Sequence, residues 1–290
     1  MSVPENRSEA EAREGTGRAA RDETAALFAH PGVDWPTLAL LAVMWVGLVL
    51  NFVWAARVSE WTLPLGLLHI AIATFFLNMS FTIWHEAAHG TIFRTRAPND
   101  IAGVLGAWPA MLPYFTVRRD HVLHHEFVND PERDPDYWFL EGSIWTLPLR
   151  YPAGAKRALS IVDRSGRPAW EPRTDRALLL LVLVTIGLLA WLVSPLAVLF
   201  AWILPKGFAM WIHAWYVNVL PHRGLPAERF RDTRIHPATW LTPLTLCHNY
   251  HGLHHVWQTV PWHRYPKVFR QKREFLESRG VPIAGTGERT

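Results

Sequence analysis

The hydrophobic residues of this chain are concentrated in four long segments. Residues 36 to 56 and residues 61 to 84 contain no charged side chain, and only a short connection separates them. Because an α-helix rises about 1.5 Å per residue, each segment can cross about 30 Å of hydrocarbon. We therefore predict a first transmembrane hairpin from these two segments.

Two further apolar segments predict a second hairpin. They cover residues 177 to 193 and residues 196 to 217, and a Ser-Pro pair offers a turn between them. Lys206 lies inside the last segment, where an ionisable side chain costs free energy unless it faces a partner or water. The shorter apolar run from 101 to 115 contains two prolines, and we expect it to be re-entrant or interfacial.

Basic residues are distributed unevenly around these segments. The loop from 90 to 175 carries 11 Arg and Lys residues and the chain after His222 carries another 11, whereas Arg57 is the only one in the two opposite connections. By the positive-inside rule, the basic side is cytoplasmic. We therefore expect a multi-pass integral membrane protein with its N-terminus, its C-terminus and its long loop on the cytoplasmic side.

These patterns predict an all-α integral membrane protein with four transmembrane helices in two hairpins and a cytosolic helical cap. We expect one domain over residues 35–275, a disordered cytosolic tail over 1–34 and a flexible C-terminal tail over 276–290. The formal charge of +4 fits contact with anionic lipid headgroups or an acidic protein partner. Nucleic acid binding is not expected, since no basic helix or aromatic-basic platform is present.

Two residue types narrow this picture further. The chain contains 16 Trp residues, which favour the interface between hydrocarbon and water. We expect Trp257, Trp262 and Tyr265 to hold the cap against this interface. Cys247 is the only cysteine, so a disulfide framework and a thiolate zinc site are excluded.

Eight of the 15 histidines fall in three short motifs, each just beyond an apolar segment on the predicted cytoplasmic side. The motifs HEAAH, HVLHH and HGLHH contain, in this order, His85 and His89; His121, His124 and His125; His251, His254 and His255. On a helix the outer histidines of each motif, at i and i+4, lie on one face. Neutral imidazole binds zinc, copper, iron and nickel, and eight or nine ligands exceed the needs of one tetrahedral ion. We therefore expect two metal ions.

Two other functions remain open at this point. HEAAH also matches H-E-x-x-H, in which Glu86 would be the general base of an intramembrane zinc protease. Such a site needs only one further ligand, which leaves both H-x-x-H-H motifs unexplained. A non-enzymatic membrane protein that stores or transports iron is the other alternative, although the acidic residues expected along the spans of a transporter are absent.

The three motifs, in this order and next to apolar segments, resemble the histidine boxes of the membrane fatty acid desaturase and hydroxylase superfamily. The resemblance covers roughly residues 35 to 270. It implies a four-helix membrane stalk, a cytosolic cap and a di-iron centre bound almost wholly by histidine. The eight box histidines are then iron ligands.

The resemblance also implies one more ligand, a histidine near the end of the fourth span with an asparagine four residues earlier that holds a metal-bound water. Asn218 and His222 have this spacing in NVLPH. His213 and His248 are the rival candidates for the ninth ligand. His248 could instead hydrogen-bond to a ligand ring, and Asp134 and Asp136 could orient ligand histidines or connect parts of the cap.

Within the superfamily, HEFVNDPERDPDYW, VLPHRG and NYHGLHHVWQTVPWHRYP resemble desaturase-like carotenoid (beta-carotene) hydroxylases, and bacterial acyl-lipid desaturases carry similar third boxes. The implied reaction uses O2 to oxidise a lipid C–H bond, as a carotenoid hydroxylase or, alternatively, as an acyl-lipid desaturase. Box spacing does not distinguish these products. No flavin or nicotinamide fingerprint is present, so we expect electrons from a separate donor such as ferredoxin, which the basic cap would attract.

Overall fold

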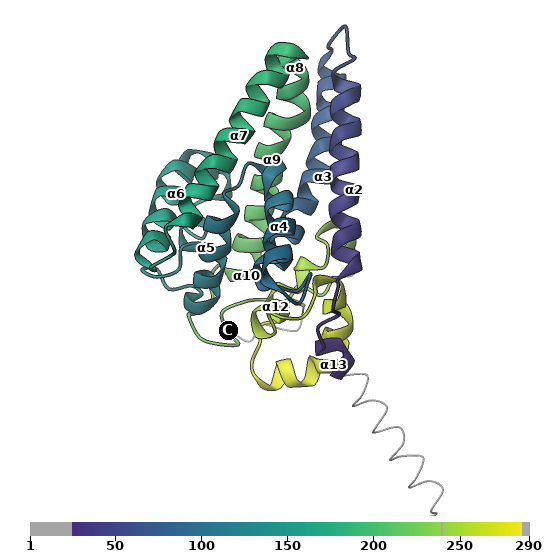
Figure 1. Ribbon diagram of the computed structural model, residues 1–290. Coiled ribbons are helices and arrows are strands. Elements are labelled where there is room, and N and C mark those ends of the chain that lie inside the picture. Colours follow the sequence, from purple (N-terminus) through teal and green to yellow (C-terminus); the bar gives the residue numbers. More distant parts are fainter. Residues whose placement is uncertain (1–24, 239, 286–290) are drawn as a thin grey trace, which may run out of the picture.

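A computed structural model describes residues 25–238 and 240–285, and within these ranges the chain is helical, with two isolated β-bridges and no β-strand. The first hairpin consists of α2 (Trp35–Ala55) and α3 (Leu63–His89), which pack side by side along their length (Figure 1). Both are long and apolar enough to cross a membrane. α3 continues five residues beyond the predicted end at 84, because its last turns carry HEAAH into the protein interior.

The second pair consists of α7 (Trp170–Leu192) and a composite helix from Pro195 to His222, which are also long and apolar enough to span. The composite helix contains α8 (Pro195–Val198), η4 (Leu199–Ile203), α9 (Leu204–His213), η5 (Ala214–Val219) and α10 (Leu220–His222). α9 packs on α3, which joins the two pairs. Four membrane-spanning helices in two pairs confirm the predicted fold class.

Both η4 and η5 are π-helical, and each lies just before a proline. Pro205 and Pro221 have no N–H for the carbonyls of Ala201 and Val217, and their rings would collide with these carbonyls in a regular α-helix. A wider turn relieves this conflict by inserting one residue into the helical register. The residues after η5, including His222, are therefore rotated relative to a regular helix.

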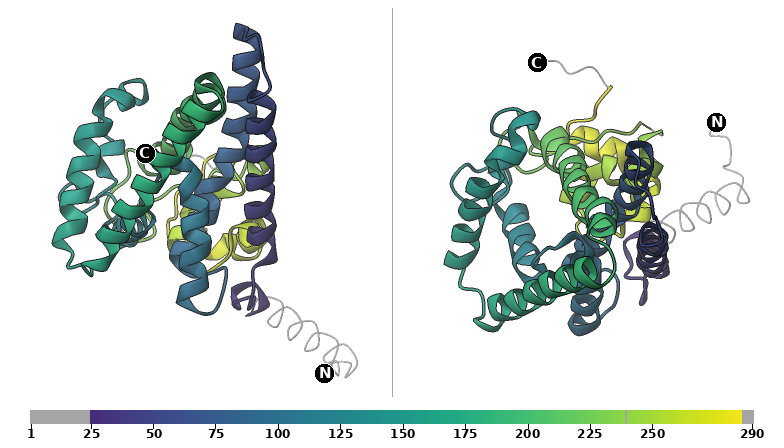
Figure 2. Two further views of the ribbon diagram at one scale, coloured as in Figure 1. Left: turned by 45° about the horizontal axis from the view of Figure 1, so that its top comes forward. Right: turned by 90° about the horizontal axis from the view of Figure 1, so that it is seen from above.

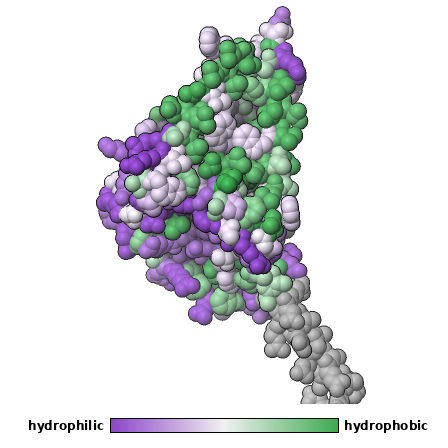
Figure 3. All heavy atoms as spheres, viewed as in Figure 1, coloured by the Kyte–Doolittle hydropathy of each residue, from purple (hydrophilic) through white to green (hydrophobic). Residues whose placement is uncertain are grey.

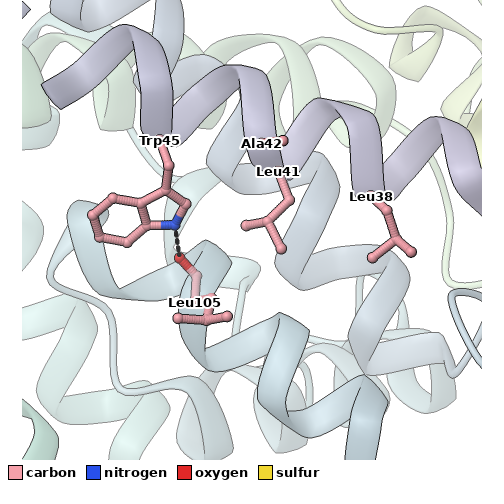
Figure 4. Close-up of a pocket in the computed structure, with 5 residues that line it drawn as sticks. All are labelled: Leu38, Leu41, Ala42, Trp45 and Leu105. Atoms are coloured by element: carbon pink, nitrogen blue, oxygen red, sulfur yellow. Dashed lines mark hydrogen bonds between the residues drawn. The ribbon is translucent and has the colours of Figure 1, made fainter. Parts of the chain in front are cut away.

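A short amphipathic helix, α4 (Arg96–Ala107), follows the first hairpin and packs on α3 beside α2. It contains part of the run from 101 to 115 and is too short to span, as predicted. Between α2 and α4 lies an open apolar groove lined by Leu38, Leu41, Ala42, Trp45 and Leu105 (Figure 4). The Trp45 indole closes one end by donating to the Leu105 carbonyl oxygen at 3.1 Å. The groove contains no histidine and is separate from the box motifs.

The remaining helices lie at one end of the bundle. α5 (Tyr114–Phe127) and α6 (Leu147–Arg164) pack on each other beside α7, and α11 (Leu241–Leu244), α12 (His251–Val256) and α13 (Tyr265–Ser278) follow the fourth span (Figures 1 and 2). The connections contain the 3₁₀ turns η1 (Trp108–Ala110), η2 (Tyr137–Phe139), η3 (Ile144–Thr146), η6 (His248–Tyr250) and η7 (Trp262–Arg264). We call the segment 223–285, as far as it is described, the cap.

Surface character follows this division. Hydrophobic residues cover the bundle over α2, α7 and α8, whereas hydrophilic residues gather over α5, α6 and the lower end (Figure 3). The predicted tails lie partly outside the described residues. Their described parts belong to one buried apolar cluster of the cap, which includes Leu27 before α2 and, at the C-terminal end, Leu276, Val281 and Ile283.

Candidate metal centre

The first histidine box ends α3. His85 and His89 lie one turn apart in its last two turns, and Gly90 then ends the helix in the left-handed conformation with a φ of 73°. Glycine adopts this conformation without the steric cost that other residues incur. The helix end therefore places both imidazoles at the boundary between the bundle and the cap.

The second box lies on α5. This helix is held in place by contacts with the neighbouring helices. The Asp175 carboxylate of α7 accepts hydrogen bonds from the backbone N–H groups of Phe115 and Thr116, at 3.0 and 2.8 Å. These are free donors in the first turn of α5, so Asp175 caps this helix from outside. Arg118 pairs with Asp100 of α4 at 2.7 Å and with Glu171 of α7. α5 is thus fixed in position and rotation relative to α4 and α7.

The third box forms α12, a single short helix in the cap. Its Gly252 lies so close to the chain segment 233–235 that an added Cβ would meet the Thr233 carbonyl oxygen at 2.7 Å. Thr233 in turn lies near His222, with its Oγ1 3.4 Å from the Nδ1 atom of that ring. The third box and the end of the fourth span are therefore packed together through a close approach that only glycine permits.

The structure brings nine histidines into two groups. The five-histidine group contains His85, His89, His121, His125 and His254, and the four-histidine group contains His124, His222, His251 and His255. Each H-x-x-H-H motif is divided between them. Its outer pair, at i and i+4, joins one group, and its middle histidine, at i+3, joins the other. The nine members are the eight box histidines and His222.

The nitrogen contacts in the five-histidine group fit a bound cation. Nε2 atoms approach one another in four contacts: His85 with His254 at 3.0 Å, His254 with His125 at 2.9 Å, His125 with His121 at 3.0 Å, and His121 with His89 at 2.8 Å. An imidazole Nε2 has either one hydrogen or one lone pair, so at most two of these contacts can be hydrogen bonds at once. Two nitrogens bound to one ion at about 2.1 Å and at right angles would also lie about 3 Å apart.

The four-histidine group passes a second test for a metal. The Nε2 atoms of His124 and His222 are buried and have no hydrogen-bond partner. Burying such a nitrogen without a partner costs free energy. The Nε2 atoms of His251 and His255, one turn apart on α12, lie 3.1 Å apart. A metal ion between these four rings would satisfy the lone pairs, so the residues present fit such an ion.

The electrostatic environment favours the ligand form of the histidines. Burial, and then the neighbouring histidines, hold the pKa values of His121, His125, His251, His254 and His255 well below the usual value. These rings are therefore neutral at physiological pH, and a neutral imidazole is what a transition metal binds.

His124 differs because of Asp134. Burial lowers the pKa of His124, but the Asp134 carboxylate, 2.9 Å from its Nδ1 atom, outweighs this and raises the pKa to about 9. The same carboxylate accepts from the backbone N–H groups of Asn129 and Asp136, both at 2.9 Å. Asp134 is thus fully hydrogen-bonded and holds Nδ1 of His124 as a donor, which leaves Nε2 toward the four-histidine group, where a metal ion would take the place of its proton. Among the described residues no hydrogen bond joins Asp136 to a histidine ring, although its charge helps to raise the pKa of His124. Burial raises the pKa of the Asp136 carboxyl to about 6.

Two other rings have hydrogen-bond partners at Nδ1, and a third, that of His85, has only the nearby Glu86 carboxylate. The Tyr265 hydroxyl lies 2.9 Å from Nδ1 of His254, and the carbonyl oxygen of Asp232 lies 3.3 Å from Nδ1 of His222. Glu86 lies 3.4 Å from Nδ1 of His85 and accepts a hydrogen bond from the Thr91 hydroxyl. Glu86 is therefore on the side of His85 opposite the five-histidine group, where it does not face the position of a zinc-bound water.

The rival candidates lie outside both groups. His248 is buried, with its Nε2 atom 3.1 Å from the Thr82 hydroxyl, and its ring contacts those of His85 and His251. The Nε2 atom of His213 lies 3.1 Å from the carbonyl oxygen of Asn78. Asn218 lies in η5 one turn before His222 and is half-buried.

Sequence reasoning missed the role of Tyr265, which we expected at the bilayer interface. Its side chain is instead buried in the cap with its hydroxyl on a box histidine. Trp262 does connect the cap to the bundle, since its indole donates to the Thr37 hydroxyl of α2 at 3.0 Å, whereas Trp257 packs on Phe28 and Phe275. The only available signal was that Tyr265 follows the third box closely in the sequence, at the start of the next helix.

Comparison with known proteins agrees with this arrangement. Dihydrorhizobitoxine desaturase of Bradyrhizobium elkanii is 27% identical over 74% of this chain and 69% of its own length. Zeaxanthin 4-ketolase of Chlamydomonas reinhardtii is 25% identical over 88% of this chain, and beta-carotene 4-ketolase 3 of Haematococcus lacustris is 26% identical over 74%. The aligned regions cover 58% and 65% of these two ketolases.

The family model named Fatty acid desaturase matches residues 59–287, which include all three boxes and His222. This match extends over most of the chain, and the relatives are desaturases and ketolases. An oxidoreductase function follows, and the zinc protease alternative loses its support. The chain belongs to the fatty acid desaturase family.

Proposed function

We propose that this protein is an O2-dependent di-iron oxidoreductase of the membrane that oxidises a C–H bond of a lipid, by hydroxylating a carotenoid ring. The observation that carries the proposal is the arrangement of nine buried or half-buried histidines in two groups whose Nε2 atoms converge. One ion in each group is the simplest use of so many nitrogen donors. Iron suits them better than zinc, because structural and catalytic zinc sites are almost always four-coordinate and the first group alone offers five nitrogens.

In this proposal, the eight box histidines and His222 are the iron ligands, and Asp134 fixes the orientation of His124. His248 and Glu86 support neighbouring rings without binding metal, and Asn218, four residues before His222, would hold a metal-bound water. Two ferrous ions held by these residues would supply the reducing power needed to turn O2 into an oxidant of an unactivated C–H bond. The protein's part is to hold nine imidazoles in place, to exclude bulk water by burying them, and to present the lipid carbon.

The ketolase relatives support a carotenoid substrate. Two of them act, by name, on carotenoids and match 88% and 74% of this chain, so the similarity includes the bundle and the cap together. Carotenoids are apolar and reside in the bilayer, and the centre lies where the ends of the spanning helices α3 and α10 meet α12 of the cap. Ring oxidation at a C–H bond is the chemistry that hydroxylases and ketolases share.

A desaturase acting on an acyl chain is the second candidate. The relative from Bradyrhizobium elkanii is a desaturase by name and covers 74% of this chain at 27% identity. Hydroxylation and desaturation both begin with removal of one hydrogen, so the same metal centre could serve either. The products differ in whether oxygen is inserted or a second, neighbouring hydrogen is removed.

Each turnover also requires electrons from outside the chain. We infer a ferredoxin-like donor that binds on the same side as the cap, which the distribution of Arg and Lys makes the cytoplasmic side. An acidic donor would be attracted by this basic side, and its association rate would fall with increasing salt. The domain over 35–275 is thus one unit that carries the lipid site in the membrane and the donor site on the cap.

The deciding experiment is pigment and acyl-chain analysis of cells that make beta-carotene and express this protein. We expect hydroxylated carotenoid with the native protein and none with a matched His124→Ala variant that is present in the membrane at the same level. Unchanged pigment together with newly unsaturated acyl chains would replace the hydroxylase by the desaturase. Unchanged pigment and acyl chains, with bound iron and no O2 uptake in the presence of donor, would favour metal storage.

A further inference from the structure

Tyr265 is the first residue of α13 and is fully buried in the cap. It lies in a cluster with Leu253 and Val268, and its hydroxyl oxygen lies 2.9 Å from Nδ1 of His254. The phenol is thus the hydrogen-bond partner of a histidine whose other nitrogen, Nε2, faces His85 and His125 in the five-histidine group. Tyr265 contacts the outer side of a ring that we propose as an iron ligand.

The chemistry of imidazole determines what this contact does. When Nε2 donates its lone pair to a metal, the ring hydrogen is on Nδ1, which then donates to the Tyr265 oxygen. A bound cation withdraws electron density from the ring, so Nδ1–H becomes a stronger donor and the hydrogen bond is stronger in the metal-bound form. Phenylalanine at this position would leave a buried N–H without an acceptor.

The cap itself is fixed so that the phenol reaches this ring. Just before α13, the Trp262 indole donates to the Thr37 hydroxyl of α2 at 3.0 Å, and Nε2 of His263 lies 2.8 Å from the buried Asp34 carboxylate. Both contacts join the start of α13 to the start of the first span. The place of the Tyr265 hydroxyl beside the ring of His254 therefore depends on how the cap packs on the bundle.

We propose that Tyr265 positions the ring of His254 for the ion in the five-histidine group, as Asp134 positions the ring of His124 for the ion in the four-histidine group. The inference rests on the proposed di-iron function and goes beyond it, because it assigns one supporting residue to each ion. His254 and His124 are the middle histidines of their boxes. In each box the two outer histidines belong to one group, and the middle histidine belongs to the other group. Each of these separated rings has one dedicated side-chain partner at Nδ1.

The test compares purified Tyr265→Phe, Asp134→Asn and a matched control, Tyr250→Phe, in the full-length protein. Tyr250 is buried in the same cluster and packs on Phe269 of α13, but its hydroxyl bonds to Thr242, away from the metal groups. Iron per chain is measured during titration with a ferrous chelator, and the Mössbauer spectrum of each variant reports which of the two irons remains. The thermal unfolding of the iron-free variants controls for damage to the fold.

We expect Tyr265→Phe to bind one of two irons about 10- to 100-fold more weakly, with Asp134→Asn weakening the other one. The control should retain both, and the iron-free forms of the two tyrosine variants should unfold at similar temperatures. Unchanged iron affinity and spectrum in Tyr265→Phe, or equal iron loss in Tyr250→Phe, would overturn the inference and leave the di-iron function intact. Absence of stoichiometric iron in the native protein would overturn both.

Discussion

The Nδ1 atom of His124 lies 2.9 Å from Oδ1 of Asp134, and both side chains are buried. This contact aims the Nε2 lone pair of His124 at three other histidines that come from the fourth span and from α12. We therefore expect Asp134→Asn to weaken metal binding by about 10- to 100-fold, because the amide supplies no negative charge and its NH2 group would oppose the N–H of Asn129 or Asp136. The iron content after dialysis measures the effect. Asp130→Asn, in the same turn but in contact with Arg133 and no histidine, should keep wild-type iron.

Replacing a box histidine tests the centre directly. His124→Ala and His254→Ala each remove one nitrogen from a different group, so both should lose bound iron and at least 100-fold in turnover, roughly the upper range seen for metal-site changes. Both proteins should still insert in membranes, since the spans are unchanged. His213→Gln is the control, because His213 contacts Asn78 and not the metal groups. Full activity of either alanine variant would contradict the di-iron assignment.

The close approach at Gly252 offers a test of packing. Gly252→Ala places a methyl group 2.7 Å from the Thr233 carbonyl oxygen, which belongs to the backbone and cannot move alone. We expect a cost of about 1–3 kcal/mol in unfolding free energy and reduced iron in the four-histidine group, as α12 moves away from His222. Thermal unfolding in detergent and iron analysis report both effects. Gly187→Ala on α7, where nothing lies within 4 Å of the added methyl group, should be neutral or slightly stabilising. Equal unfolding temperatures and iron contents in the two variants would show that the contact between Gly252 and Thr233 is not tight.

The Asp175 carboxylate, which accepts hydrogen bonds from the first turn of α5, can be removed without changing a histidine. Asp175→Ala leaves the N–H groups of Phe115 and Thr116 without their acceptor, at a cost of about 1–3 kcal/mol. The unfolding temperature should fall, and iron should be bound more weakly through His121, His124 and His125. The comparison is Asp163→Ala, whose exposed carboxylate pairs with Arg167 at the surface. Similar small losses of unfolding temperature and of iron affinity in both variants would mean that α5 does not depend on the Asp175 carboxylate.

Removal of the metal should destabilise the whole lower end of the bundle. A ligand that binds only the folded state stabilises it by RT ln(1 + [L]/Kd), which is about 2.7 kcal/mol at a hundredfold excess over Kd. We therefore expect a strong iron chelator to lower the unfolding temperature, and ferrous iron to restore it. Differential scanning fluorimetry with and without chelator measures the shift. An unfolding temperature that does not respond to chelator and iron would argue against a metal centre held by nine histidines.

Much of the fold followed from local patterns along the chain. The four apolar segments were long enough to predict four spans, and the structure has helices at Trp35–Ala55, Leu63–His89, Trp170–Leu192 and Pro195–His222. The ends differ from the prediction because helices continue into polar sequence when packing covers them, as for HEAAH at the end of α3. The π-helical turns before Pro205 and Pro221 could be explained afterwards by the missing N–H groups but were not predicted.

The sequence by itself determined which histidines share a helical face. At about 100° per residue, the outer pair of H-x-x-H-H is separated by about 40°, and the middle histidine lies about 60° to the other side of the first. These angles follow from the local helix alone, so a helical HVLHH or HGLHH points its middle histidine in a different direction from its outer pair.

Only the tertiary structure decided which faces meet. It joined the outer pair of the second box to HEAAH, and the outer pair of the third box to His222, and it brought Tyr265 and Asp134 to the two middle histidines. These choices depend on contacts between residues far apart in the chain, such as those through Asp175, Gly252 and Trp262. Helical periodicity carries no information about such contacts, because they arise from the packing of whole helices.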